Sequence, residues 1–291
     1  LFRLATVLLC CWTFSLADPA RVLFVADSCY ATRANKAKGD KANRSQIDKT
    51  INLYKSLLQD SLLAEKAALG IMRSEYFRIR FATKNEKEKN KLIASAKTLG
   101  DTLHARFPKN KEMTSLYATI VSMWGASIGP LKAVKQGVAA RVRDLADSAG
   151  DYQILGRSHQ LLPYIPLILP WPDKELALKY LRLAVKNQSK DPYSYFFFFF
   201  FYFDRKEYAN AEKIIQQGLD LGVRTDFFLE DKRGRWHLKE LLKKKEKSND
   251  KKRKLNKTHS MQFRILATII FAMFAITIFI GGISIYEVDQ Y

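Results

Sequence analysis

The sequence is poor in the residues that cross-link or interrupt a chain. Of its 291 residues, three are Cys, 13 are Gly and 8 are Pro. Two of the cysteines, Cys10 and Cys11, lie within the first 17 residues, so Cys29 would be the single thiol of a processed chain. One thiol excludes an intramolecular disulfide and a cysteine-based metal site. We expect Cys29 to pack as a small residue in the first helix. Few Gly and Pro, with abundant Ala, Leu, Lys and Tyr, favour a helical fold over a β-rich one.

The sequence also lacks the motifs that accompany most enzymatic sites. No Gly-rich phosphate loop follows a strand pattern, and no Gly-x-Ser-x-Gly nucleophile motif occurs. The four histidines are not spaced as metal ligands with one another or with a Cys: His104, His159, His237 and His259. We therefore expect no enzymatic activity, no metal and no cofactor.

Positive charge is plentiful, but its distribution argues against a nucleic-acid partner. The formal net charge is +20, and residues 237–260 alone hold ten Lys/Arg against three Asp/Glu. The remaining charges are spread singly over the faces of expected helices. No basic stripe interleaved with aromatic residues occurs, although such a stripe is typical of nucleic-acid grooves. We expect solvated helix faces and no nucleic-acid binding.

A repeat near the C-terminal half indicates the architecture. Four positions of one segment recur 34 residues later with similar side chains: Ala177, Leu181, Ala184 and Val185 become Ala211, Ile215, Gly218 and Leu219. Thirty-four residues is the period of a tetratricopeptide helix pair, in which small residues allow close helix approach. We predict an all-α, tetratricopeptide-like helical domain of stacked hairpins over residues 18–245, a scaffold for binding rather than for catalysis.

Apolar periodicity predicts the individual helices. They cover residues 47–58, 62–81, 88–107, 112–128, 131–146 and 152–162. Ser45 and Asp48 approximate a capping arrangement for the first of these. Residues 196–203 are eight consecutive aromatics, which cannot all face one stripe of a helix. The run therefore predicts a helix buried on several sides, with a slipped homopolymer as the competing explanation.

Residues 163–172 form the one stretch that helical repeats do not explain. Four prolines in ten residues exclude a regular helix, yet nearly all the residues between them are apolar. We expect this loop to pack against the helix bundle. A wall of a ligand pocket and a contact with a partner are the alternatives.

The two ends of the chain carry targeting patterns that conflict. Residues 1–17 combine one basic residue, an apolar run and a small-x-small ending, which predicts a signal peptide cleaved after Ala17. A lipid anchor at Cys10 is the alternative. Residues 246–262 read as a basic linker before an expected transmembrane helix over 263–286.

The charge pattern around that helix favours a cytoplasmic body, whereas the signal peptide favours export. We expect export. Either the tail inserts against its charge preference, or Met261 begins a separate reading frame.

A set of short motifs occurs in a defined order between Tyr117 and Ala184. They are Trp124-Gly125-Ala126, Gly129-Pro130-Leu131-Lys132-Ala133, Leu155-Gly156-Arg157, Leu162-Pro163 and the segment from Lys174 to Leu181. This order resembles the T component of TRAP transporters, the tripartite ATP-independent periplasmic carriers. The resemblance covers about residues 26–245. The chain departs from the family pattern at Trp171-Pro172-Asp173, where the family carries a Gly-Gly-Asp turn, and in its apolar C-terminal stretch.

The resemblance implies a non-enzymatic periplasmic accessory component of a solute importer. Such a protein would dock the periplasmic solute-binding subunit, assemble as a homotrimer and pass on a small apolar or amphipathic ligand. Attachment to a membrane, by the C-terminal span or a lipid, is also expected. The alternative is a membrane-anchored tetratricopeptide interaction module without a transport role, its basic run lying against anionic headgroups.

Six residues are candidates for a ligand pocket: Trp124, Lys132, Arg157, His159, Tyr164 and Trp171. Arginine and lysine would hold a ligand carboxylate, and arginine can do so through two hydrogen bonds. The aromatic side chains would flank an apolar ligand body. A structural salt bridge or cap is the alternative role for Arg157, and a core position the alternative for Trp124.

Overall fold

The computed structural model describes residues 18–255, with side chains as far as Lys243. The expected signal peptide (1–17) and transmembrane helix (263–286) lie outside the described residues, as does the end of the expected linker. The fold of residues 18–255 is all-α, with helices joined by loops and no strand, as the sequence predicts. The helices are α1 (Pro19–Ala31), α2 (Arg44–Ser56), α3 (Ala64–Phe81), α4 (Glu86–Arg106), α5 (Lys111–Ile128), α6 (Pro130–Lys135), α7 (Val138–Ala149), α8 (Tyr152–Leu161), α9 (Lys174–Asn187), α10 (Pro192–Asp204), α11 (Tyr208–Leu219), the 3-10 turn η1 (Thr225–Phe227) and α12 (Phe228–Leu255).

Short polar side chains begin most of these helices. Asn85, Asn110, Asp151 and Asp173 each accept a backbone N–H of the first turn. The expected cap of α2 was wrong. Asn43, not Ser45, caps this helix by accepting the N–H of residue 45 over 2.9 Å.

One expected helix is divided in two. Residues 131–146 were predicted as a single helix, but α6 ends at Lys135 and α7 begins at Val138. Gly137 lies between them with φ of +62°, in the left-handed region that favours glycine. A single Gly in an otherwise helical pattern gave too weak a signal for this break.

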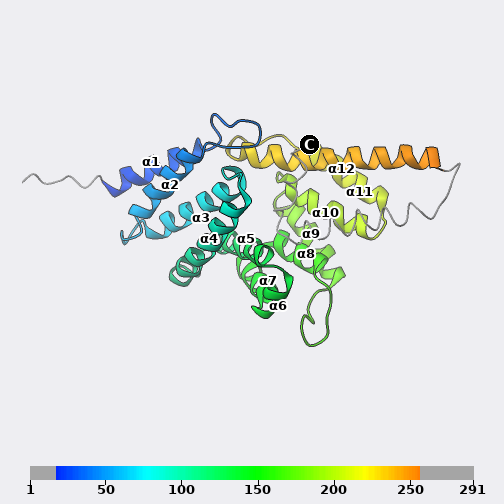
Figure 1. The fold of residues 1–291 in the computed structure, drawn as a ribbon, viewed down its shortest axis with the longest axis horizontal. Helices are drawn as coiled ribbons and strands as arrows, with labels where there is room; N and C mark the ends of the chain where they lie inside the picture. Colours follow the sequence, from blue (N-terminus) through cyan, green and yellow to red (C-terminus); the bar gives the residue numbers. More distant parts are fainter. Residues whose placement is uncertain (1–17, 256–291) are drawn as a thin grey trace, which may run out of the picture.

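Successive helices pack on one another and leave two main apolar clusters. The larger cluster joins α1 to α5 with α7, and the second joins α9, α10, α11 and α12. Figure 1 shows α1 to α5 on one side, α8 to α11 on the other, and α6 and α7 below the junction. No helix within residues 18–255 is long and apolar enough to cross a bilayer.

The aromatic run forms most of α10. Five of the six phenylalanines 196–201 are buried, and Phe203 at the end of the run is 36% exposed. Contacts with α9, α11 and α12 surround the helix on several sides. These neighbours accommodate an aromatic run too long for a single helix face.

Helix α12 also connects the two ends of the described chain. Leu229, in its first turn, packs in a cluster with Ile47, Phe77 and Phe81 of α2 and α3. The helix lies along the top of the view in Figure 1 and reaches from the C-terminal helices back to the N-terminal ones. It continues to Leu255, so residues 246–255 of the expected linker are helical.

Charged contacts reinforce this closure. Arg33, two residues after the end of α1, forms an ion pair with Glu230 over 2.9 Å and donates a hydrogen bond to the Asp226 carbonyl. Arg233 pairs with Asp40 over 2.6 Å and donates to the Arg80 carbonyl over 2.7 Å. Both arginines are almost fully buried, although the Asp40 carboxylate is partly exposed. The helices therefore form a closed ring.

Candidate functional site

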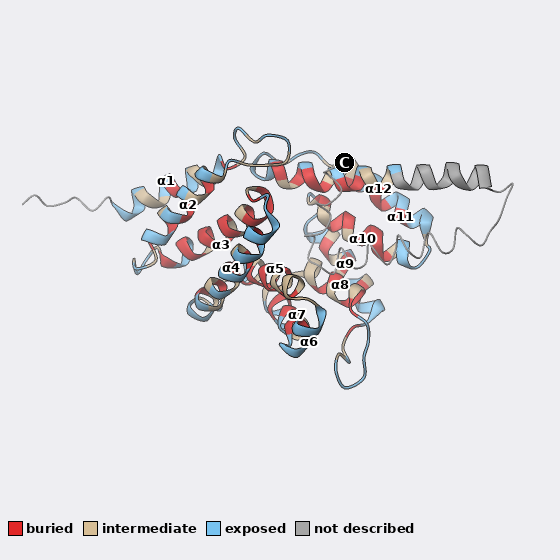
Figure 2. Cartoon of the chain, viewed as in Figure 1, coloured by how far each residue is buried: buried red, intermediate tan, exposed pale blue. Residues whose placement is uncertain are grey.

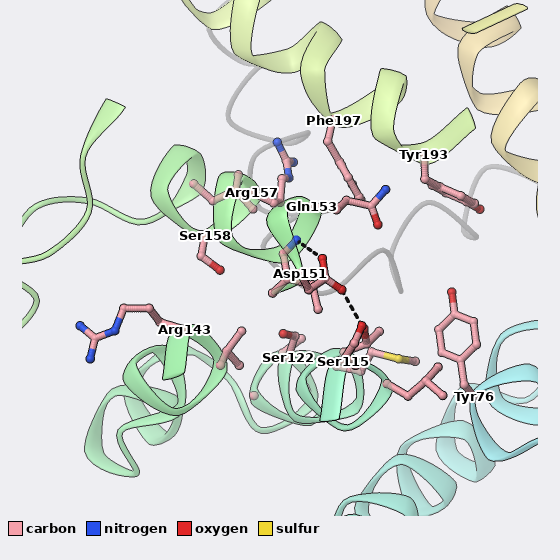
Figure 3. Close-up of a pocket in the computed structure, with 18 of the residues that line it drawn as sticks. Tyr76, Ser115, Ser122, Arg143, Asp151, Gln153, Arg157, Ser158, Tyr193 and Phe197 are labelled. Atoms are coloured by element: carbon pink, nitrogen blue, oxygen red, sulfur yellow. Dashed lines mark hydrogen bonds between the residues drawn. The ribbon is translucent and has the colours of Figure 1, made fainter. Parts of the chain in front are cut away.

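A cavity of about 1640 Å³ lies inside the ring of helices. Side chains from α1, α3, α5, α7, α8, α10 and α12 line it, together with the base of the 163–172 loop. The cavity thus draws on both halves of the chain and depends on the packing of α12 across them. Figure 3 shows α5, α8 and α10 contributing residues from facing sides.

The lining is mainly apolar. Apolar lining residues come from α5, α7, α8, α10 and η1: Leu116, Met123, Val138, Val142, Ile154, Leu161, Phe196, Phe197 and Phe227. Several of the polar groups among them already have partners. The Ser115 hydroxyl donates to Asp151 over 2.5 Å (Figure 3). The Gln153 amide donates to Asp191 over 3.1 Å. The lining also includes charged side chains of both signs, such as Asp27, Arg73, Glu112 and Arg224.

Arg157 is one of the polar lining residues that keep unpaired atoms. Its side chain comes from α8 and is 8% exposed. Nη1 donates to Gln160 Oε1 over 2.8 Å, whereas Nε and Nη2 are buried without a hydrogen-bond partner. The guanidinium carbon lies 5.2 Å from the ring centre of Phe197 and 5.4 Å from that of Phe200. Figure 3 shows Arg157 beside Phe197 and Gln153.

The electrostatic state of Arg157 is unusual for an arginine. Burial lowers its pKa from 12.5 to about 9, and the opposing effect of Asp204 is smaller. The guanidinium stays protonated at neutral pH, but its charge is poorly compensated. The two unpaired N–H donors are shielded from solvent, and an anion that reached them would satisfy both.

Other atoms of lining residues also lack hydrogen-bond partners, among them Arg33 Nε and Glu230 Oε2. The Tyr193 hydroxyl, from α10, and Trp171 Nε1, from the 163–172 loop, are both buried and unpaired. Figure 3 shows the hydroxyls of Tyr193 and Tyr76 facing the same part of the cavity. Burial raises the pKa of Tyr76, so its phenol stays neutral and can donate a hydrogen bond.

The six residues predicted as a pocket lie in different places in the structure. Only Arg157 and Trp171 line the cavity. Lys132 is exposed on α6, and Tyr164 is 62% exposed on the loop. Trp124 is half-buried on α5, where the ammonium of Lys97 lies 4.9 Å from its ring centre.

The sixth predicted residue, His159, supports the loop rather than the cavity. Its Nδ1 accepts the backbone N–H of Asp173 over 3.0 Å. The ring lies edge-on to Trp171, with centres 5.2 Å apart, and 5.6 Å from Tyr180. Burial lowers the pKa of His159, which favours the neutral ring that this hydrogen bond requires.

The sequence reasoning missed Tyr76, Gln153 and Tyr193, which come from α3, α8 and α10. No local pattern marks them, because each is an isolated polar residue on a different helix. The comparisons add no further assignment. No family model matches the chain, and no curated protein shows significant similarity to it.

Proposed function

We propose that this protein is a non-enzymatic accessory component of a TRAP-type solute importer. It acts outside the cytoplasm, docks the solute-binding subunit and holds a small amphipathic carboxylate within its helical ring. The observation that carries the ligand half of the proposal is Arg157, a buried cation with two unpaired donors in an apolar cavity. The proposed role in transport rests on the family resemblance over residues 26–245.

The repeat positions support a tetratricopeptide-like framework for this role. Ala177, Leu181, Ala211 and Ile215 are all buried, and they lie on α9 and α11. Helix α8 packs extensively on α9, as α10 does on α11, which is the arrangement of two successive helix pairs. Gly218 supports the same close packing, because a Cβ there would lie 2.7 Å from Leu238. Stacked pairs of this kind curve into concave binding surfaces.

The position of the free donors selects the ligand chemistry. Nε–H and Nη2–H lie on the same edge of a guanidinium, the edge that binds both oxygens of one carboxylate in parallel. The phenyl rings and aliphatic side chains around Arg157 would cover an apolar ligand body. A ligand with one carboxylate and a hydrocarbon portion fits this combination better than a sugar or a nucleotide.

The ligand can be tested with matched probes. A medium-chain fatty acid and the alcohol of equal length would be titrated into the full chain, with binding followed by native mass spectrometry. A bidentate pair with a buried arginine predicts at least a tenfold preference for the acid. Arg157→Gln should abolish the preference, whereas Arg143→Gln should keep it. Arg143 also lines the cavity but is already paired with Asp144 over 2.6 Å. Equal binding of acid and alcohol by the wild-type chain would refute the ligand proposal.

Docking requires a separate test. Gentle affinity purification of the full chain from its native cells should recover a periplasmic solute-binding protein, and native mass spectrometry should report a trimer. Recovery of no such subunit would leave the alternative, a membrane-held interaction module.

A further inference from the structure

The 163–172 loop projects from the protein instead of packing on it. The side chain of Leu167 is fully exposed, and Ile168 is 63% exposed. Figure 1 shows the loop extending below α8, and Figure 2 shows most of it as exposed. The expectation that it would pack against the bundle is therefore wrong for the tip, while the base forms part of the cavity wall.

Backbone hydrogen bonds hold the tip in a fixed shape. Ile165 and Leu169 exchange two of them, over 3.0 and 2.7 Å. Between these residues, Leu167 has φ of +66°, which is costly for a residue other than glycine. At the base, the ring of Trp171 lies 5.1 Å from the Arg143 guanidinium. The loop is thus held in one conformation by contacts at its tip and base, and its apolar side chains are exposed to solvent.

Helix α6 supplies a second apolar projection at the same edge. Leu131 is 80% exposed and Val134 is 57% exposed. Val134 lines the cavity together with Ile165 and Ile168, so α6 and the loop lie around a common chamber. Figure 1 shows both at the lower edge of the molecule. We refer to residues 130–135 and 163–172 together as the apolar edge.

The charge of this edge has one sign. Neither segment contains Asp or Glu, and α6 carries Lys132 and Lys135, both exposed. No ion pair of either lysine occurs in the described part of the chain. Tyr164, 62% exposed, adds an aromatic ring with a polar end. Apolar tips, an amphipathic aromatic and nearby unpaired lysines are the features that suit a membrane interface with anionic lipids.

We propose that the apolar edge docks on an anionic lipid bilayer. Leu131, Val134, Leu167 and Ile168 enter the boundary between headgroups and acyl chains. Tyr164 lies at headgroup level, and the lysines lie near lipid phosphates. Two narrow projections offer little of the continuous flat area that a stable protein interface buries, which favours lipid over a protein partner. The docking proposal goes beyond the importer role and does not depend on it.

The test needs a local readout, because the apolar stretch 265–286 could by itself carry the full chain to vesicles. The probe is an environment-sensitive fluorophore on Leu167→Cys, in a background with the three native cysteines replaced by serine. The matched control places the fluorophore on Lys239→Cys, an exposed position of α12 at the opposite side of the view in Figure 1. Both chains are reconstituted with vesicles of phosphatidylcholine alone or with added phosphatidylglycerol, each containing a spin-labelled quencher lipid.

If the edge docks, the emission of the fluorophore at position 167 should shift to the blue and be quenched in the anionic vesicles. The emission of the fluorophore at position 239 should show neither change. Replacing Lys132 or Lys135 by Gln should lower the ratio of docked to undocked chains about fivefold for each lysine. Because both lysines and Leu167 are exposed, these changes leave the folded core intact. The proposal is overturned if position 167 stays unquenched, if position 239 is quenched equally, or if the shift requires an added protein instead of lipid.

Discussion

Removing the charge of Arg157 should stabilise the ligand-free protein, and this sign separates a binding residue from a structural one. A residue that holds the fold together lowers stability when it is truncated. Arg157, in contrast, keeps a buried charge with two unpaired N–H groups. The perturbation is Arg157→Met, because methionine is flexible and apolar enough to fill most of the space left behind. A buried charge replaced by a well-packed apolar residue often gives a more stable protein.

The size of the effect follows from the pKa and the contacts. Lowering the pKa from 12.5 to about 9 corresponds to about 5 kcal/mol of destabilisation at neutral pH. Cation–π contacts of the guanidinium with Phe197 and Phe200 stabilise the folded state by about 1 kcal/mol each. The lost hydrogen bond to Gln160 costs about 1–2 kcal/mol. We expect a net gain of about 1–2 kcal/mol, which raises Tm by about 2–8 °C for a domain of this size.

The gain should also depend on pH. The folded-state pKa of Arg157 lies below that of the unfolded chain, so the unfolded state binds more protons between the two values. The stability deficit of the wild type is therefore complete at pH 7 and shrinks as the pH rises through about 9. Urea unfolding at neutral and alkaline pH should show the two proteins converging.

A matched control strengthens the test. Arg33 is equally buried but paired with Glu230, so Arg33→Met should cost about 3–5 kcal/mol by leaving a buried carboxylate without its partner. If Arg157→Met also lost stability at pH 7, with no convergence at alkaline pH, Arg157 would be a structural residue. The argument for a ligand anion would then fail.

Three further outcomes follow from the packing. Gly156→Val should lower the free energy of unfolding by about 1–3 kcal/mol in urea, because a Cβ there would lie 2.8 Å from Cγ of Leu181; unchanged stability would contradict the close approach of α8 and α9. Arg233→Met should release the first turns of α12 and speed amide exchange there, while α4 and α5 keep their protection. Acidification should weaken the base of the 163–172 loop. The folded pKa of His159 lies below 6.5, so the unfolded chain binds more protons as the pH falls and the hydrogen bond from Asp173 is lost. Amide exchange at Asp173 should then exceed the intrinsic pH effect, and constant protection would count against this role.

Helices could be predicted from the sequence wherever the signals are local. Apolar spacing and the residues that cap or end a helix act over a few positions, so α3, α5 and α8 begin and end within about two residues of their predicted bounds. The same locality explains the error at Gly137. One glycine inside an apolar pattern is tolerated in many helices, and only the tertiary packing of α6 and α7 decides that this one ends a helix.

The candidate site could be predicted from the sequence much less well than the helices. Arg157 was selected through a family motif, and no feature of the motif reveals that its Nε and Nη2 atoms are buried and unpaired. Trp124 and Lys132 belong to neighbouring motifs but lie on other surfaces, because nearness in sequence does not place side chains on one face. Tyr193 escaped notice for the opposite reason. It reaches the cavity from a helix that begins 31 residues after α8 ends.

The closure of the ring explains why a cavity of this size remains open. Helical pairs stacked in sequence contact mainly their neighbours, and such an array can change its curvature at small cost. Here Leu229 and Arg233 of α12 pack against residues 148 to 193 positions earlier in the chain. The closing contact is buried and partly ionic, so opening it would expose apolar surface and leave charges unpaired. A chain fixed at both ends in this way cannot contract its ring to fill the interior. On the proposed function, α12 would contribute to ligand binding by closing the ring around the cavity that Arg157 lines.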